Sequence, residues 1–112
     1  MKIVTEKISL KELDGMAKSM FGNLVKAVVD IEKKEMVVDG ELHADEEALL
    51  INNGSEQKNL WGINIYPEEK ENFIEFDSMI NIRPSMGNMT RTVEDESLKK
   101  MIIKIVDDLI IK

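Results

Sequence analysis

The feature that most constrains the fold is a change of hydrophobic period, from helical spacing near both ends of the chain to alternation in its middle. Four segments alternate apolar and polar residues, at 24–32, 35–44, 60–66 and 74–83. Such alternation is typical of strands with one buried face. We therefore expect an antiparallel sheet with one apolar side and one polar side.

Two of these segments contain nearly the same pentad, INIYP at 63–67 and INIRP at 80–84. Asparagine is depleted in strands, so its place between two isoleucines needs a reason. Alternation puts the isoleucines on the apolar side and puts Asn64 and Asn81 on the polar side. A turn in PEEKEN (67–72) then predicts three cross-strand pairs: Ile65 with Ile74, Ile63 with Phe76, and Trp61 with Ser78.

Both ends of the chain show helical periodicity. Apolar residues recur at helical spacing over 10–21, and Ser9 with Glu12 forms a capping box. A second apolar stripe runs from Leu98 to Ile110 behind a predicted N-cap at Asp95. These patterns predict a single two-layer α+β domain over residues 1–112. Its four-stranded antiparallel meander would carry an N-terminal and a C-terminal helix on one face, and residues 2–6 would add an edge strand.

Residues 44–51 (ADEEALLI) fit two structures. Alanine, glutamate and leucine favour helix, whereas the turn signal NNGS at 52–55, with the strand that follows it, favours a continued strand. We predict the strand. Strict alternation would then point Glu46 toward the core, which a β-bulge near Asp45 or a short helix would avoid.

The composition is that of an ordinary soluble protein, with 43% hydrophobic and 33% charged residues. The absence of cysteine excludes disulfides, thiolate metal sites and cysteine nucleophiles. The N-terminal residues lack the apolar core of a signal peptide, and the run 101–103 is far shorter than a membrane span. We expect a cytoplasmic protein with no membrane association.

The net charge of −7 is concentrated in one stretch. Between Asp30 and Glu47, eight acidic residues stand against Lys33 and Lys34, which gives −6. Such a surface repels phosphate backbones, so nucleic acid is disfavoured as a ligand. A basic protein partner, a divalent metal or a second copy of the chain fits better.

By alternation, the polar side of the sheet presents nine candidate ligand or interface residues: Glu41, His43, Asp45, Glu47, Asn64, Tyr66, Asp77, Asn81 and Arg83. His43 and Asp45, two positions apart on a strand, could share a metal ion, and Asp77 or Glu41 could complete its ligands. Arg83 would then bind an anionic substrate. The solvated face of a sheet that is buried on one side only has the same composition, so a solvated face without a ligand site remains an alternative interpretation of these residues.

Four stretches together resemble a family of short prokaryotic proteins classed as a domain of unknown function. They are GELHADEE (40–47), GSEQ (54–57), LWGINIYP (60–67) and INIRPSMGN (80–88). The resemblance spans nearly the whole chain and implies no activity, cofactor or catalytic residue.

Two functional hypotheses follow. The first is a non-catalytic binding or self-assembly protein that uses the acidic polar face of its sheet. The second is a small metal-assisted, hydrolase-like enzyme built on Glu41, His43, Asp45 and Asp77, with Arg83 holding the substrate.

Overall fold

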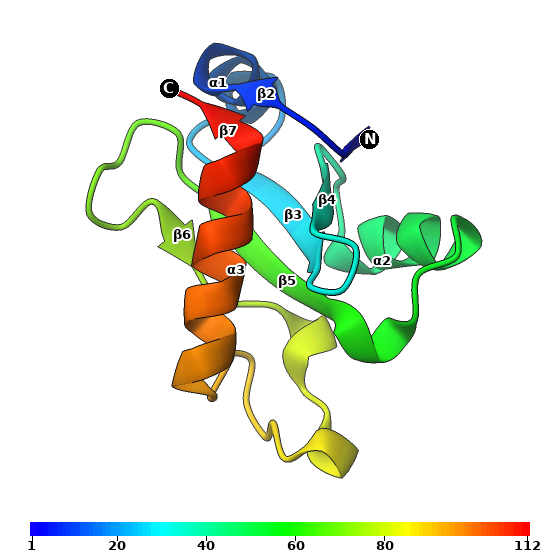
Figure 1. Cartoon of the computed structure of the whole chain (residues 1–112). Helices are drawn as coiled ribbons and strands as arrows, with labels where there is room; N and C mark the ends of the chain where they lie inside the picture. The colour runs from blue at the N-terminus through cyan, green and yellow to red at the C-terminus, as the bar shows by residue number, and fades with distance from the viewer.

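A five-stranded antiparallel sheet forms the centre of the computed structural model, which describes residues 1–112 (Figure 1). Its strand order is β1-β4-β3-β5-β6. The strands are β1 (Lys2–Val4), β3 (Val25–Asp30), β4 (Glu35–Val38), β5 (Leu60–Ile65) and β6 (Ile74–Glu75). The predicted α+β class is therefore confirmed, with five strands in place of four. The edge strand expected near the N-terminus is present as β1.

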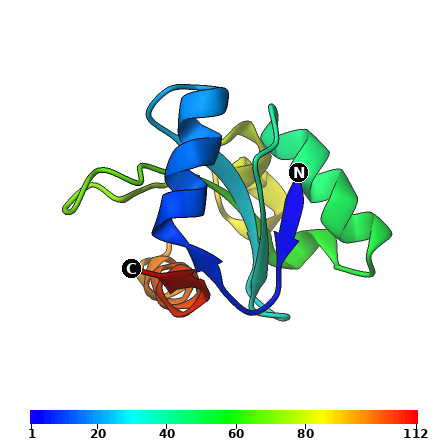
Figure 2. The ribbon, with the colours of Figure 1, turned by 90° about the horizontal axis from the view of Figure 1, so that it is seen from above.

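Two terminal helices pack on one face of this sheet (Figure 2). They are α1 (Leu10–Ser19) and α3 (Glu96–Leu109), and each begins at its predicted cap, because the Ser9 and Asp95 side chains accept hydrogen bonds from first-turn amides. Their apolar stripes share the main core with the inward side chains of the strands; its members include Leu13, Ala17, Ala27, Val29, Ile63, Ile65, Ile102 and Val106. A short parallel pair, β2 (Ile8–Ser9) with β7 (Ile110–Ile111), joins the two helices.

A third helix, α2 (His43–Asn52), covers the other face, which the sequence predicted to be open. Figure 2 shows α2 on the opposite side of the sheet from α1 and α3. A second, smaller apolar cluster lies between α2 and the sheet; it consists of Val28, Val37, Leu50 and Leu60. The strand predicted over 44–51 is therefore wrong, and so is the two-layer arrangement with one wet face.

A turn made of Lys33 and Lys34 alone would place Ile31 opposite Met36, but in the β3–β4 hairpin Val29 lies opposite Met36, a register two residues away. The cause is a longer turn, in which the Asp30 carboxylate accepts from the amides of Glu32 and Lys33, and Lys34 adopts a φ of 57°. A shift of two residues keeps every side chain on its predicted face.

The strands do not continue as a meander after β4. In a meander β5 would pair with β4, but here it pairs with β3, on the other side of the β3–β4 hairpin. Ile65 faces Ile74 as predicted, but the pairing with β6 stops at Glu75. The two further predicted pairs are absent, and the second pentad is not a strand: it begins within the 3-10 turn η2 (Met79–Asn81). Two more such turns are η1 (Gln57–Asn59) and η3 (Pro84–Met86). None of the helices is long and apolar enough to cross a membrane.

Candidate functional site

The outer edge of β5 is completed by a side chain where a neighbouring strand would be expected. Asn81 accepts from the amide of Gly62 through Oδ1 and donates to the carbonyl of Gly62 through Nδ2, both at 2.9 Å. Its Nδ2 also donates to the carbonyl of Arg91 at 3.0 Å. The fully buried amide of Asn81 thus reproduces the two hydrogen bonds of a strand partner.

A second asparagine holds the segment that contains η2 and η3, residues 76–94, which we call the edge loop. Asn88 donates to the carbonyls of Asn81, Thr90 and Thr92 and accepts from the amide of Glu94. The Glu94 carboxylate accepts in turn from the amides of Met89 and Thr90 and from the Thr90 hydroxyl. These hydrogen bonds, first of all the one from the Thr90 hydroxyl, lower the pKa of Glu94. The edge loop is irregular in backbone but densely hydrogen-bonded.

The edge loop nevertheless exposes large apolar side chains. Met79 is 65% exposed, Ile82 38%, Met86 48% and Met89 61%. Figure 1 shows the loop in yellow at the end of the molecule where α3 begins. These four side chains are therefore carried by a fixed loop at one end of the protein.

His43 is buried at the start of α2 and contacts the sheet. Its Nε2 lies 2.8 Å from the carbonyl oxygen of Ile63. Because a carbonyl only accepts, Nε2 carries the proton and Nδ1 is the unprotonated nitrogen of the neutral ring. Burial lowers the pKa of His43, so the ring is neutral at pH 7.

Asn64, Tyr66 and Asp77 lie farther along β5 and into the edge loop. Asn64 Nδ2 and the Tyr66 hydroxyl both donate to Oε1 of Glu75, at 2.8 and 3.0 Å. Asn64 also donates to the backbone carbonyl of Asp77, whose carboxylate accepts from Arg91 at 2.6 Å. Burial, with the bond to Glu75 second, raises the pKa of Tyr66. The bond from Asn64 to the Asp77 carbonyl ties the edge loop to the sheet.

Arg83 contacts residues from two other elements. Its guanidinium carbon lies 4.7 Å from the centre of the Trp61 ring on β5, and Nη2 lies 3.3 Å from Oε2 of Glu47 on α2. The side chains of Arg83 and Glu47 are only 11% and 14% exposed. Burial lowers the pKa of Arg83, against the opposing effect of Glu47. The predicted substrate-binding arginine therefore already has an acidic partner.

The metal set expected from the sequence is not assembled. Glu41 and Asp45 are exposed. His43 and Asp45 lie on a helix, where positions two apart point about 200° away from each other. No three histidine or acidic side chains lie close enough together to hold a metal ion. The i, i+2 argument failed because it depended on a strand at these residues.

One unusual acid was missed as a candidate. Glu46, on the inner side of α2, is fully buried, and burial raises its pKa to about 9. Its Oε2 accepts from the amide of Gly40 at 3.0 Å, while Oε1 has no partner. A Cβ on Gly40 would lie 2.6 Å from Cγ of Glu46, so the glycine leaves the space for this carboxyl. The sequence contained a signal for this residue, because strict alternation of the predicted strand pointed Glu46 toward the core.

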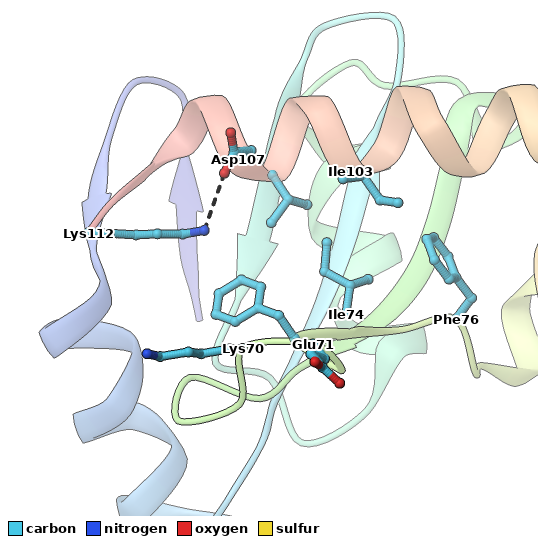
Figure 3. Close-up of a pocket in the computed structure, with 9 residues that line it drawn as sticks. Lys70, Glu71, Ile74, Phe76, Ile103, Asp107 and Lys112 are labelled. Carbon is cyan, nitrogen blue, oxygen red and sulfur yellow. Dashed lines mark hydrogen bonds and ion pairs between the residues drawn. The ribbon is translucent and has the colours of Figure 1, made fainter.

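A groove between the β6 region and α3 is lined by none of the nine predicted residues (Figure 3). Its volume is about 250 Å³, and its apolar wall includes Phe73, Ile74 and Ile103. The charged residues around it are Lys70, Glu71, Asp107 and Lys112, of which Lys112 and Asp107 form an ion pair at 3.3 Å. Two charges of each sign give the groove no preference for an anion or a cation.

Fold and site together describe a small α+β protein in which three of the polar candidates, Asn64, Asn81 and Arg83, join the edge loop to the sheet. The chain belongs to the family of proteins of unknown function DUF5674, whose model matches residues 2–109. Comparison with curated proteins and with solved structures gave no match.

Proposed function

We propose that the protein is a non-catalytic self-assembly protein that binds a second copy of itself through the edge loop. The observation that carries this proposal is the exposure of Met79, Ile82, Met86 and Met89 on a loop fixed by Asn81 and Asn88. The acidic sheet face of the sequence hypothesis cannot serve, because α2 and the edge loop cover much of it.

Exposed apolar side chains concentrated in one segment are typical of contact surfaces, whereas single ones are common on any protein. Methionine suits such a surface, because its flexible, polarizable side chain adapts to the partner. The hydrogen bonds made by Asn81 and Asn88 hold the loop in one conformation before binding. Less conformational entropy is therefore lost on association.

The charges around the loop favour a second copy as the partner. Residues 78–93 contain Arg83 and Arg91 and no acid, although the chain carries −7 overall. Three exposed acids, at 94–96, follow directly. Arg91 pairs with Asp77 of its own copy at 2.6 Å, but its side chain is about half exposed. In a two-fold contact, where residue i of one copy meets residue j of the other and the reverse, Arg91 can therefore also face Glu94–Glu96 of the second copy. The loop thus supplies an apolar centre flanked by both signs of charge.

Light scattering coupled to size exclusion tests this proposal. We expect the wild-type protein to have twice the chain mass of 12.8 kDa. The double variant Met79→Ser, Met89→Ser is expected to be monomeric with an unchanged circular dichroism spectrum. The control, Met20→Ser with Met101→Ser, changes two exposed methionines on other elements and is expected to stay dimeric.

Two results would contradict the proposal. A wild-type mass of one chain at the highest soluble concentration would exclude self-assembly. A dimer that survives in the edge-loop variant and dissociates in the control would place the contact on another surface.

A further inference from the structure

Two buried N–H donors beside the edge loop have no hydrogen-bond partner in the protein. They are Nε1 of Trp61, a residue only 3% exposed, and Nη1 of Arg83. Buried tryptophan N–H groups usually find an acceptor, and a guanidinium offers five donors, of which Arg83 uses one on a side chain. An unpartnered buried donor is unfavourable, so an acceptor from outside the chain that reached it would bind favourably.

A pocket lies against Trp61, between β5, the edge loop and the start of α3. Its volume is about 460 Å³, within the range of small-molecule sites. Its walls include Met86, Gly87 and Asn88. Arg83 stands next to this wall, because Arg83 and Asn88 exchange both of their backbone hydrogen bonds. Both unpartnered donors thus belong to residues at or beside the pocket.

The opposite wall of the pocket carries hydrogen-bond acceptors. Glu94 and Asp95 line it, and each uses only one carboxylate oxygen within the protein. Glu94 accepts three bonds through Oε2, and Asp95 caps α3 through Oδ1. The second oxygen of each is free to accept from a ligand. Because Arg83 is already paired with Glu47, the pocket as a whole is negative and disfavours an anion.

We infer that this pocket binds a small uncharged molecule that presents a carbonyl acceptor beside an N–H donor, the pattern of nucleobases and carboxamides. The carbonyl accepts from Trp61 and Arg83, and the N–H group donates to Asp95 or Glu94. Because neither donor atom is exposed, a side chain at the pocket wall must move before a ligand can reach the indole N–H.

The only tryptophan of the chain reports on its own site. In a ¹H–¹⁵N spectrum its indole N–H gives a single peak, which is expected to move saturably on titration with cytosine, uracil or nicotinamide. Inorganic phosphate, a small anion, is expected to leave the peak in place. These probes separate a carbonyl-type ligand from a general anion site.

Asp95→Asn is the matched variant, because asparagine is as good an N-cap as aspartate and keeps α3 intact. It replaces the free acceptor oxygen by an amide donor, so binding of the active probe is expected to weaken by about tenfold or more. The inference is overturned if none of the three probes moves the indole peak saturably or if phosphate moves it as far. Unchanged affinity in Asp95→Asn would exclude Asp95 as the acceptor of the ligand's N–H group.

Discussion

Glu46→Gln is expected to raise the free energy of unfolding by about 3 kcal/mol at pH 7 and to leave it nearly unchanged near pH 4. The folded protein raises the pKa of this carboxyl from 4.5 to about 9, chiefly by burial. The native state therefore holds a proton that the unfolded chain releases. This contribution to stability is complete below pH 4.5 and is lost as the pH rises toward 9. Glutamine has the same shape and stays neutral throughout.

The other groups that act on the pKa of Glu46 do not offset its burial. The hydrogen bond from the Gly40 amide, Lys26 and the amino terminus lower this pKa, whereas Asp39 raises it. Urea unfolding of both proteins at several pH values measures the difference, in which all other titrating groups cancel. Glu41→Gln removes an exposed carboxylate just ahead of the same helix and is the control. A difference between wild type and Glu46→Gln that does not change with pH would show that Glu46 is ionised in the native state.

The elements with a single strong local signal were predictable from sequence. Ser9 and Asp95 marked the starts of α1 and α3, and alternation placed the strands β3, β4 and β5 on their correct faces. The α2 helix was missed for a physical reason. Glu46 lies on its buried side and breaks its apolar stripe, and NNGS can follow a strand or end a helix. Here it ends one, with Gly54 at a φ of 95°.

The twin pentads show why much of the site was beyond local reasoning. INIYP lies largely in a strand, whereas INIRP begins within a 3-10 turn, although the two differ at a single residue. The deciding contacts lie elsewhere in the chain: Gly62 offers its backbone to Asn81, and a Cβ on Gly62 would lie 2.6 Å from the side chain of Ser78. Pattern analysis could rank Asn64 and Asn81 as unusual. It could not identify their partners, and it gave no signal for Asn88.

Asn81→Ala is expected to destabilise the protein by about 4 kcal/mol, the larger of the two effects argued here. The change removes three hydrogen bonds: it leaves the buried amide and carbonyl of Gly62, and the partly buried carbonyl of Arg91, without this partner. The substitution Asn81→Asp would be no milder, because a carboxylate would face both carbonyls. Asn72→Ala, at an exposed position of the β5–β6 connection, is the control and is expected to change stability by less than about 0.5 kcal/mol.

Hydrogen exchange separates loss of this edge contact from a general loss of stability. The Gly62 amide is protected only by the Asn81 side chain, since the outer edge of β5 has no strand beside it at that residue. Under native conditions, the exchange rate of the Gly62 amide is expected to be higher in Asn81→Ala than in the wild type. The exchange rate of the Ile63 amide, whose backbone faces β3, is expected to rise by a smaller factor. Equal acceleration at both amides would mean that the substitution only lowers global stability. A Gly62 amide that keeps its protection would show that another group closes the edge of β5, and the edge loop would then lack the anchor on which its fixed conformation depends.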